Sequence, residues 1–361
     1  MGFSKGGREL DPQPIHAAQS GAAIINSMFR RWYILTILCY LTGDALAQLT
    51  PNFSAEGELS SQSAAADAET LNKYSYTQVH MAMPVRLTVW CGSQRQARTA
   101  CQAAFRRITE LELALTDYDS RSELRQLCKV AGHEPVNVSD ELFDVLQHAR
   151  RMTVSTGGAF DATAGEVIQL WRTARKTGRL PEAAAIEESL RNVGATAIEL
   201  DSHARTVAWS RPRLWLDLGG IAKGFIGDHA MVVLRDHGIG RARYHAGGDM
   251  VLGDAPPGKD GWEIDLPGLP ETVLANCGVS VSGDTSQFLE VDGIRYSHVI
   301  DPRTGQAVTS RQMAVVVAPS GVQSDALASA GCVMEKKAFD RLMASLPHTS
   351  GRTFIAEDHD E

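Results

Sequence analysis

The chain has 361 residues, of which 43% are hydrophobic and 22% are charged, and its formal net charge is −8. This composition supplies enough apolar material for a packed core and excludes an intrinsically disordered chain. Non-specific nucleic-acid binding usually needs an excess of Lys and Arg, so we expect no nucleic-acid partner. At roughly 150 residues per domain, the length allows one large domain or two ordinary ones.

Residues 1–47 have the features of a secretory signal peptide. Two arginines precede the apolar run 32–41, and a small-x-small cleavage pattern follows at 45–47. The apolar run has about ten residues, whereas a membrane-spanning helix needs ~20. We therefore expect a cleaved signal, export to a periplasmic compartment and a start of translation at Met28. A buried N-terminal helix is the alternative interpretation.

Residues 48–73 are rich in Ser and Ala and have no hydrophobic period, which predicts a flexible leader. No comparable linker follows, so we expect a single domain over 74–355. Five cysteines remain after the signal, and their odd number and wide spacing indicate at most one or two disulfides and no zinc site. They are Cys91, Cys101, Cys128, Cys277 and Cys332.

The first half of this domain contains clear signals for secondary structure. Apolar and polar residues alternate over 83–90, which predicts a strand. From Ser93 to Leu115 apolar residues recur at helical spacing. Ser139, followed by two acidic residues, is typical of a helix N-cap, and the glycines at 157–158 should end that helix.

Further along the chain, we predict a short strand at 214–216, a turn at 217–220 and a helix at 221–237. Strands should dominate from about 241 to 317, and a last helix should run from about 324 to 334. Strand blocks mixed irregularly with helices indicate the α+β class, here a mixed sheet with flanking helices, rather than a doubly wound sheet.

Segment 216–224, with sequence LDLGGIAKG, is the first candidate for chemistry. Its two glycines let the backbone approach a ligand, and the following helix start offers free amide groups. Lys223 could reach a phosphate, and Asp217 could accept a hydrogen bond from a ribose or a ring nitrogen. The spacing matches neither GxGxxG nor a Walker sequence, and a tight turn with a capping Asp is an equally good interpretation.

Segment 296–305, with sequence YSHVIDPRTG, is the second candidate. His298 could act as a general base near neutral pH, oriented by Asp301 three residues later. The alternative is a structural His298 followed by a turn that Asp301 caps.

Two further patterns have both a functional and a structural interpretation. Asp325 and Ser329 are four residues apart on one helix face, where they could bind one hard cation, or Asp325 could simply complement the helix dipole. Segments 158–165 and 244–249 place small residues beside an aromatic group, which suits either a flat ligand or ordinary turns.

Six short segments of the chain, taken in order, resemble the motifs of the ApbE-type FAD:protein FMN transferases over about 74–334. They are FDATAG, DLGGIAKG, HAGGD, SGDTSQF, YSHVIDPRTG and SDALASA. The resemblance implies a single large flavin-transferase domain and Mg²⁺-dependent transfer of FMN from FAD to a Thr or Ser hydroxyl, with release of AMP. It also implies an acceptor protein with a Ser/Thr flavinylation motif, for example a membrane redox subunit. Export from the cytoplasm is usual in this family.

The resemblance also implies roles for individual residues. FAD contacts fall on Met81, Tyr118, Ala159, Phe160, Asp161, Asp217, Lys223 and Val299. The Mg²⁺ ligands fall on Gly220 through its carbonyl, Asp325 and Ser329, and the base for the incoming hydroxyl falls on His298, with Asp301 beside it. The chain departs from the family pattern at Ala82-Met83, where Gly-Thr is usual, and at His245, where Asn is usual.

Two other functions fit the same residues. An FAD pyrophosphatase would direct water at the phosphorus and release FMN and AMP. A non-catalytic flavin-binding protein would use the same pocket without a reaction.

Overall fold

The computed structural model describes residues 70–356, except 131, 133 and 284–286. All the described residues belong to one unit. The expected signal peptide and most of the expected leader lie outside the described residues. The first strand begins at Asn72, inside the last two residues of that leader.

The described elements follow the chain from β1 to β14. The helices are α2 (Gln94–Leu115), α3 (Glu123–Val130), α4 (Asp140–Ser155), η1 (Ala162–Ala164), α5 (Gly165–Thr177), α6 (Ala183–Leu190), η2 (Ala195–Ala197), α7 (Ala222–Asp236), α8 (Gly321–Gly331) and α9 (Lys336–Ser345). The strands are β1 (Asn72–His80), β2 (Met83–Cys91), β3 (Val136–Asn137), β4 (Ile198–Asp201), β5 (Thr206–Trp209), β6 (Ala242–Ala246), β7 (Asp249–Leu252), β8 (Trp262–Ile264), β9 (Thr272–Leu274), β10 (Cys277–Ser282), β11 (Phe288–Val291), β12 (Ile294–Ser297), β13 (Gln312–Ala318) and β14 (Ser350–Ile355). Within the described ranges, none of the helices is both long and apolar enough to cross a membrane.

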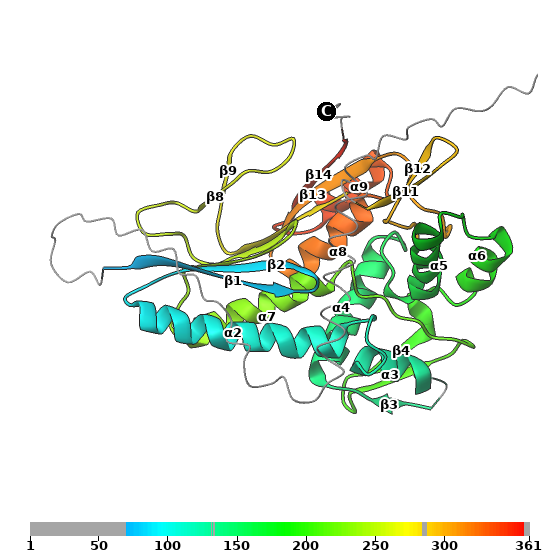
Figure 1. Ribbon diagram of the computed structural model, residues 1–361, viewed down its shortest axis with the longest axis horizontal. Coiled ribbons are helices and arrows are strands. Elements are labelled where there is room, and N and C mark those ends of the chain that lie inside the picture. The colour runs from blue at the N-terminus through cyan, green and yellow to red at the C-terminus, as the bar shows by residue number, and fades with distance from the viewer. Residues whose placement is uncertain (1–69, 131, 133, 284–286, 357–361) are drawn as a thin grey trace, which may run out of the picture. The chain divides into compact units, whose positions relative to one another are not determined.

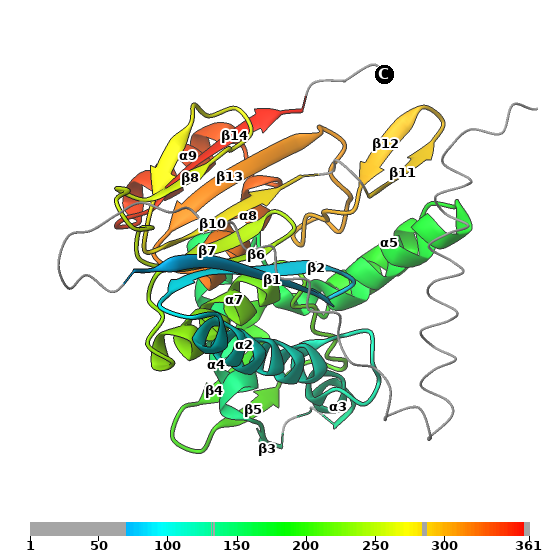
Figure 2. The same cartoon turned by 60° about the vertical axis from the view of Figure 1, so that its left-hand side comes forward.

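A seven-stranded sheet, in the order β1-β2-β6-β7-β10-β13-β14, forms the centre of the described unit (Figures 1 and 2). The α+β class is therefore confirmed. The expected mixture of parallel and antiparallel strands is wrong, because each neighbouring pair in this sheet is antiparallel. Hairpins such as β1–β2 and β6–β7 reverse the chain directly and so impose antiparallel pairing.

The two faces of the sheet are covered by different elements. Helices α2, α7 and α8 contact one face, and the hairpin β8–β9 covers the other (Figure 1). Successive side chains of a strand point to opposite faces of the sheet, so the same strands supply apolar residues to the core under the helices and to the core under β8–β9. On β13, Val316 joins the core under the helices, while its neighbour Val315 packs against Trp262 and the rest of the β8–β9 side.

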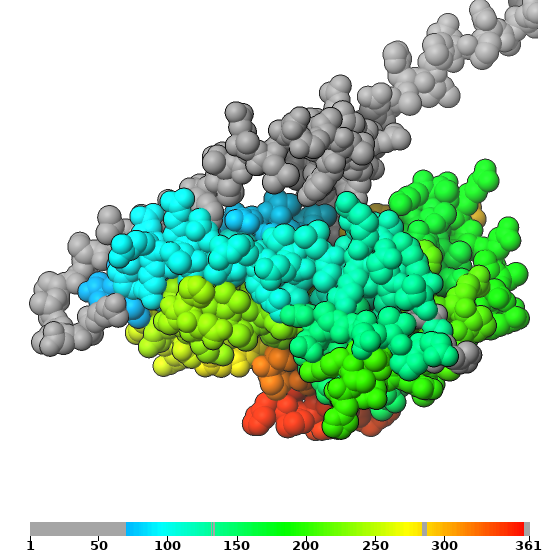
Figure 3. Space-filling model, turned by 90° about the horizontal axis from the view of Figure 1, so that it is seen from below, coloured from blue at the N-terminus to red at the C-terminus, as the bar shows by residue number. Residues whose placement is uncertain are grey.

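Helices α7 and α8 cross at very short distance, and this crossing positions the candidate site. A Cβ atom at Gly224 would lie 2.0 Å from the carbonyl oxygen of Gly321, so only glycine fits there. Glycine is also required at Gly278 of β10, where a Cβ would lie 2.3 Å from the Ser320 carbonyl oxygen. On the far side of α7, helix α2 lies next to it along the molecular surface (Figure 3).

The segment 296–305 is fixed against α5. The ring of Trp171 stacks on Tyr296 at 5.5 Å, and Trp171 Nε1 donates a 2.8 Å hydrogen bond to the Gly305 carbonyl. A separate apolar cluster around Val167, Trp171 and Ile300 surrounds this contact. Segment 296–305, which contains His298, is thereby held beside α5, the helix that follows the FDATAG segment at 160–165.

Most expected elements are confirmed. The strand at 83–90 and the helix after Ser93 are β2 and α2, and the helix at 221–237 is α7 within one residue at each end. Ser93 and Ser139 both cap their helices, since each side-chain oxygen accepts a first-turn backbone N–H.

Two expectations are wrong. No strand forms at 214–216, because the backbone there bonds to other partners: Gly165 N–H donates to the Trp215 carbonyl, and Leu216 N–H donates to Cys128 Sγ. The helix expected at 324–334 begins at Gly321 and is not the last, since α9 follows it.

The cysteines contribute to packing. Cys101, Cys128 and Cys277 are free thiols. Cys91, Cys101 and Cys332 are buried, and Cys128 and Cys277 are half-buried.

Candidate active site

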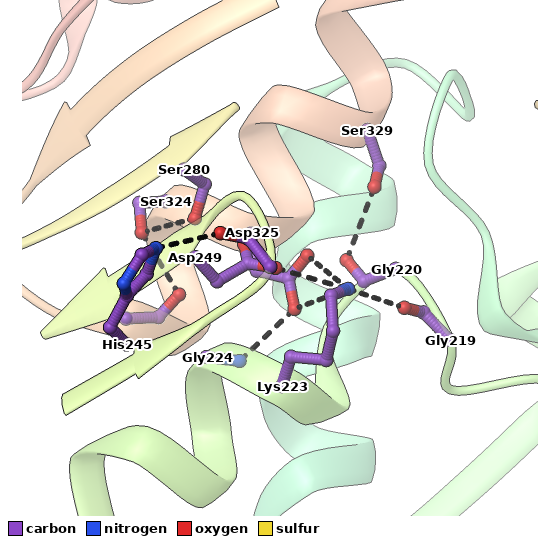
Figure 4. Close-up of polar contacts among 12 residues, drawn as sticks. Gly219, Gly220, Lys223, Gly224, His245, Asp249, Ser280, Ser324, Asp325 and Ser329 are labelled. Atoms are coloured by element: carbon purple, nitrogen blue, oxygen red, sulfur yellow. Dashed lines mark hydrogen bonds and ion pairs between the residues drawn. The ribbon is translucent and has the colours of Figure 1, made fainter. Parts of the chain in front are cut away.

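Lys223 lies between two carboxylates, at the point where the first turn of α7 faces α8 and the start of β7. Its Nζ is 3.3 Å from Asp325 Oδ1 and 3.3 Å from Asp249 Oδ2. The same ammonium group donates a 3.0 Å hydrogen bond to the Gly219 carbonyl (Figure 4). Three elements therefore meet at one cation.

The surroundings change the protonation of this cluster. Asp325 is 1% exposed, and burial, together with the nearby Asp249, raises its pKa from 3.8 to about 6. Lys223 and the Gly224 N–H oppose this rise; the N–H donates a 3.0 Å hydrogen bond to Asp325 Oδ2. Burial alone lowers the pKa of Lys223, but the two carboxylates outweigh burial and raise it. The lysine is therefore charged at neutral pH.

The glycine turn before α7 presents its carbonyl groups to the same centre. Asp217 Oδ1 accepts a 2.8 Å hydrogen bond from Gly219 N–H, which fixes the turn. Ser329 Oγ, one turn after Asp325 on α8, lies 3.5 Å from the Gly220 carbonyl oxygen. A Cβ at Gly220 would lie 2.8 Å from that hydroxyl, so glycine permits the approach.

The three expected Mg²⁺ ligands, Gly220, Asp325 and Ser329, are thus brought together by the fold. Their donors are a carbonyl, a carboxylate and a hydroxyl, and all are the hard oxygen atoms that Mg²⁺ prefers. Asp249 adds a buried Oδ1 that has no hydrogen-bond partner among the described residues. The described part of the chain has no group of three or more His, Cys, Asp or Glu that could hold a metal. The donor set therefore fits an ion that takes its other ligands from a substrate or water.

His298 is held by Gln287, the residue directly before β11. Its backbone N–H donates a 3.0 Å hydrogen bond to the Gln287 carbonyl, and its Nδ1 lies 3.2 Å from the same oxygen. Because a carbonyl can only accept, Nδ1 carries the hydrogen, and the basic lone pair of the neutral ring is on Nε2.

Asp301 bonds within its own turn. Its Oδ1 accepts from the backbone N–H and Nε of Arg303, and its Oδ2 accepts from Nη2, each at 2.9 Å. These contacts agree with the turn-capping interpretation. The Arg303 side chain also reaches the Val333 carbonyl at 3.4 Å, so this turn lies near the end of α8.

The other expected FAD contacts occupy several elements. Met81 lies in the β1–β2 turn with φ of 50°, and its N–H donates to Glu112 Oε1 at 2.6 Å. Tyr118 follows α2 and is 74% exposed. Ala159, Phe160 and Asp161 are buried before η1, and Val299 follows β12. The Asp161 carboxylate accepts hydrogen bonds from both the N–H and the hydroxyl of Thr163, so it caps η1.

Sequence reasoning did not identify Asp249, which pairs with Lys223, or Arg172, which bonds to both Asp117 and Asp217. Asp249 follows the glycines of HAGGD, and this position was the available signal. Asp117 precedes Tyr118 directly. Arg172 had no sequence signal, because its two carboxylate partners lie 45 and 55 residues away.

The fold and the site define a class of protein: an α+β domain with a buried lysine–carboxylate centre beside a glycine turn. The sequence model of the ApbE family matches residues 81–351, and the chain belongs to this family. This result confirms the resemblance of the six motifs.

Individual relatives support the assignment. The FAD:protein FMN transferase of Klebsiella pneumoniae (strain 342) is 30% identical over 247 residues, covering 68% of this chain and 77% of that protein. The protein of the same name from Treponema pallidum (strain Nichols) is 28% identical over 303 residues, covering 77% and 83%.

Solved structures agree. The crystal structure of the ApbE protein of Thermotoga maritima superimposes with a TM-score of 0.69 at 27% identity, covering 78% of this chain and 93% of that one. The apo flavinyl transferase ApbE of Pseudomonas stutzeri gives a TM-score of 0.70 at 21% identity, covering 80% and 92%, and shows the shared fold.

Proposed function

We propose that this protein is an FAD:protein FMN transferase, an enzyme that takes FAD as its substrate and modifies a second protein. Relatives that carry this name support the proposal. The observation that carries it is that the fold brings the Gly220 carbonyl, Ser329 and Asp325 together beside Lys223, because these hard oxygen donors could hold a Mg²⁺ ion that attracts the anionic pyrophosphate of FAD.

The proposed reaction moves one phosphoryl-linked group. A Thr or Ser hydroxyl oxygen of the acceptor forms a bond to the phosphorus of the FMN half, and the bond from that phosphorus to the AMP oxygen breaks. AMP leaves with the bonding electron pair. The negative oxygens of a pyrophosphate repel nucleophiles, so positive charge at Lys223 favours both binding and departure.

Asp325, Ser329 and the Gly220 carbonyl would hold Mg²⁺, which would neutralise charge on the phosphate oxygens. Asp249 keeps Lys223 directed at the same place, through the 3.3 Å ion pair. The turn fixed by Asp217 keeps the Gly220 carbonyl facing α8.

His298 would remove the proton of the acceptor hydroxyl at Nε2. An alcohol is a weak nucleophile, and a positioned base contributes on the order of 10²–10⁴-fold to such a step. The hydrogen bond from Nδ1 to the Gln287 carbonyl would hold the ring in the required tautomer.

The test combines acceptor mass with product analysis. The purified protein, FAD, MgCl₂ and a candidate acceptor domain are incubated; acceptor mass is measured by mass spectrometry, and AMP and FMN by chromatography. We expect the acceptor to gain the mass of FMN with release of AMP, and we expect loss of both with EDTA, His298→Ala or Asp325→Asn. Free FMN with an unmodified acceptor would instead identify an FAD pyrophosphatase. Tight FAD binding without AMP would identify a non-catalytic flavin-binding protein.

A further inference from the structure

Arg172 on α5 joins two chain segments that are distant in sequence. Its Nη2 donates a 2.6 Å hydrogen bond to Asp217 Oδ2, in the glycine turn before α7. Its Nη1 donates to Asp117 Oδ2, in the segment after α2. The guanidinium carbon also lies 4.7 Å from the centre of the Tyr118 ring. One side chain thus connects α5 to both segments.

These contacts are protected from water. The side chains of Arg172, Asp117 and Asp217 are 15%, 9% and 6% exposed. A guanidinium can bond two carboxylates with separate nitrogens while its flat face contacts a ring, and a lysine ammonium cannot do this. The arrangement therefore fixes geometry as well as charge.

Tyr118 differs from its partners, because it is 74% exposed. An exposed aromatic ring is normally free to change rotamer, but a cation on one face restrains it. The restrained ring offers a flat surface of the kind on which a planar ligand stacks.

A continuous series of contacts runs from this ring to the lysine–carboxylate centre. Arg172 holds Asp217 through Oδ2, and Asp217 holds Gly219 N–H through Oδ1 at 2.8 Å. The Gly219 carbonyl then accepts from Lys223 Nζ at 3.0 Å, and Lys223 pairs with Asp325 at 3.3 Å.

We infer that Arg172 is a positioning residue that fixes the Tyr118 ring relative to the Lys223–Asp325 centre, so that one ligand with a planar ring and a pyrophosphate contacts both. The inference rests on the proposed function, since FAD is a ligand of this kind. Arg172 acts through Tyr118, because Asp217 keeps its own 2.8 Å hydrogen bond from Gly219 N–H through Oδ1, and Arg172 assists neither proton transfer nor phosphorus chemistry directly.

The first test compares a whole ligand with its pyrophosphate part. In Arg172→Gln we expect the Kd for FAD to rise by at least about tenfold, while the Kd for inorganic pyrophosphate changes by less than about twofold, because pyrophosphate reaches only the lysine centre. Flavin fluorescence reports FAD binding and calorimetry reports pyrophosphate binding. A purely structural defect would weaken both ligands equally and would overturn the inference.

The second test is a double-mutant cycle. If Arg172 acts through the ring, then Tyr118→Leu should weaken FAD binding, and adding Arg172→Gln should weaken it little further. Fully additive effects would contradict the inference. Arg172→Lys should bind FAD as weakly as Arg172→Gln, because charge without the planar fork cannot hold both segments. The lysine variant and Tyr118→Leu also keep the test available if Arg172→Gln does not fold.

Arg205 provides the matched control. It pairs with Asp140 at 3.1 Å and Asp144 at 2.7 Å, and it lies 4.9 Å from the centre of the Phe143 ring, so it repeats the chemistry of Arg172 away from the site. Arg205→Gln should leave the Kd for FAD unchanged. If the unmodified protein neither binds FAD nor transfers FMN, the proposed function fails. If it does both, and Arg172→Gln binds FAD with the same Kd, only the role of Arg172 fails.

Discussion

At the scale of single residues, the site depends on one lysine that serves two buried acids. The side chains of Asp249 and Asp325 are 5% and 1% exposed, and both are 3.3 Å from Lys223 Nζ. Two carboxylates buried this close would repel each other without a cation between them. Lys223 therefore stabilises the native fold, in addition to any role toward a ligand.

Lys223→Met should reveal this dependence. We expect the free energy of unfolding at pH 7 to fall by about 3 kcal/mol, because the substitution leaves two buried carboxylates without a counter-charge. The loss should shrink at acidic pH, since Lys223 no longer opposes the raised pKa of Asp325 and that acid takes up a proton more readily. Urea unfolding at several pH values measures both effects.

Asp249→Asn in the Lys223→Met background is the control, because it removes one of the two charges. It should restore part of the lost stability. The prediction is contradicted if the free energy of unfolding of the Lys223→Met single variant lies within about 0.5 kcal/mol of that of the unmodified protein. The ion pairs of Lys223 would then not provide the stability assigned to them.

At the scale of elements, the start of α8 is the critical contact. Asp228 of α7 accepts hydrogen bonds from the backbone N–H groups of Gly321 and Val322 at 2.7 and 2.8 Å. These bonds satisfy amides that the helix itself cannot pair, and they explain why α8 begins three residues before the expected Ser324. They also fix the position from which Asp325 faces Lys223.

Asp228 should make stability depend on pH. Burial raises its pKa from 3.8 to about 6, so the folded state binds a proton more tightly than the unfolded state. The contribution of Asp228 to the free energy of unfolding is therefore fully present below about pH 4 and is lost as the pH rises to about 6, with a slope of up to about 1.4 kcal/mol per pH unit. Asp228→Asn should remove this slope, as measured by urea unfolding between pH 4 and 7.

Asp201 supplies the comparison of opposite sign. Backbone N–H groups of Ala204 and His203 lower the pKa of this exposed carboxyl, so Asp201→Asn should remove a contribution that grows with pH. Equal pH profiles for Asp228→Asn and the unmodified protein would contradict the assigned role of Asp228.

At the scale of the whole molecule, we propose that the protein acts after export. Residues 1–47 carry the charged, apolar and small-x-small pattern of a cleaved signal. When the full chain is expressed in a bacterial host, the periplasmic fraction should contain a protein whose mass corresponds to a start at Gln48. Ala47→Arg should block cleavage. Recovery of an uncleaved chain from the cytoplasm would contradict export.

The sequence allowed prediction of those parts of the fold whose determinants are local. Helix caps such as Ser93 and Ser139, the glycine turn before α7 and the i, i+4 pair of Asp325 and Ser329 all involve neighbours in the chain. The prediction of a strand at 214–216 was wrong because a strand needs a partner strand, and none of the described strands pairs with this segment.

The missed site residues have a related cause. Arg172 meets Asp217 and Asp117 only after α5, the glycine turn and the end of α2 have come together. Asp249 becomes part of the lysine centre only when β7 lies beside α7. Such contacts are properties of tertiary packing, and local patterns do not encode them.

The lysine between the two acids also determines where their counter-charge comes from. Carboxylates that relied on a dissolved cation would have to wait for it, and the last folding step would then depend on cation concentration. Lys223 belongs to the same helix turn whose Gly224 N–H binds Asp325, so the compensating charge arrives with the backbone itself. The counter-charge of both buried acids is therefore part of the fold itself and does not have to be supplied by a dissolved cation.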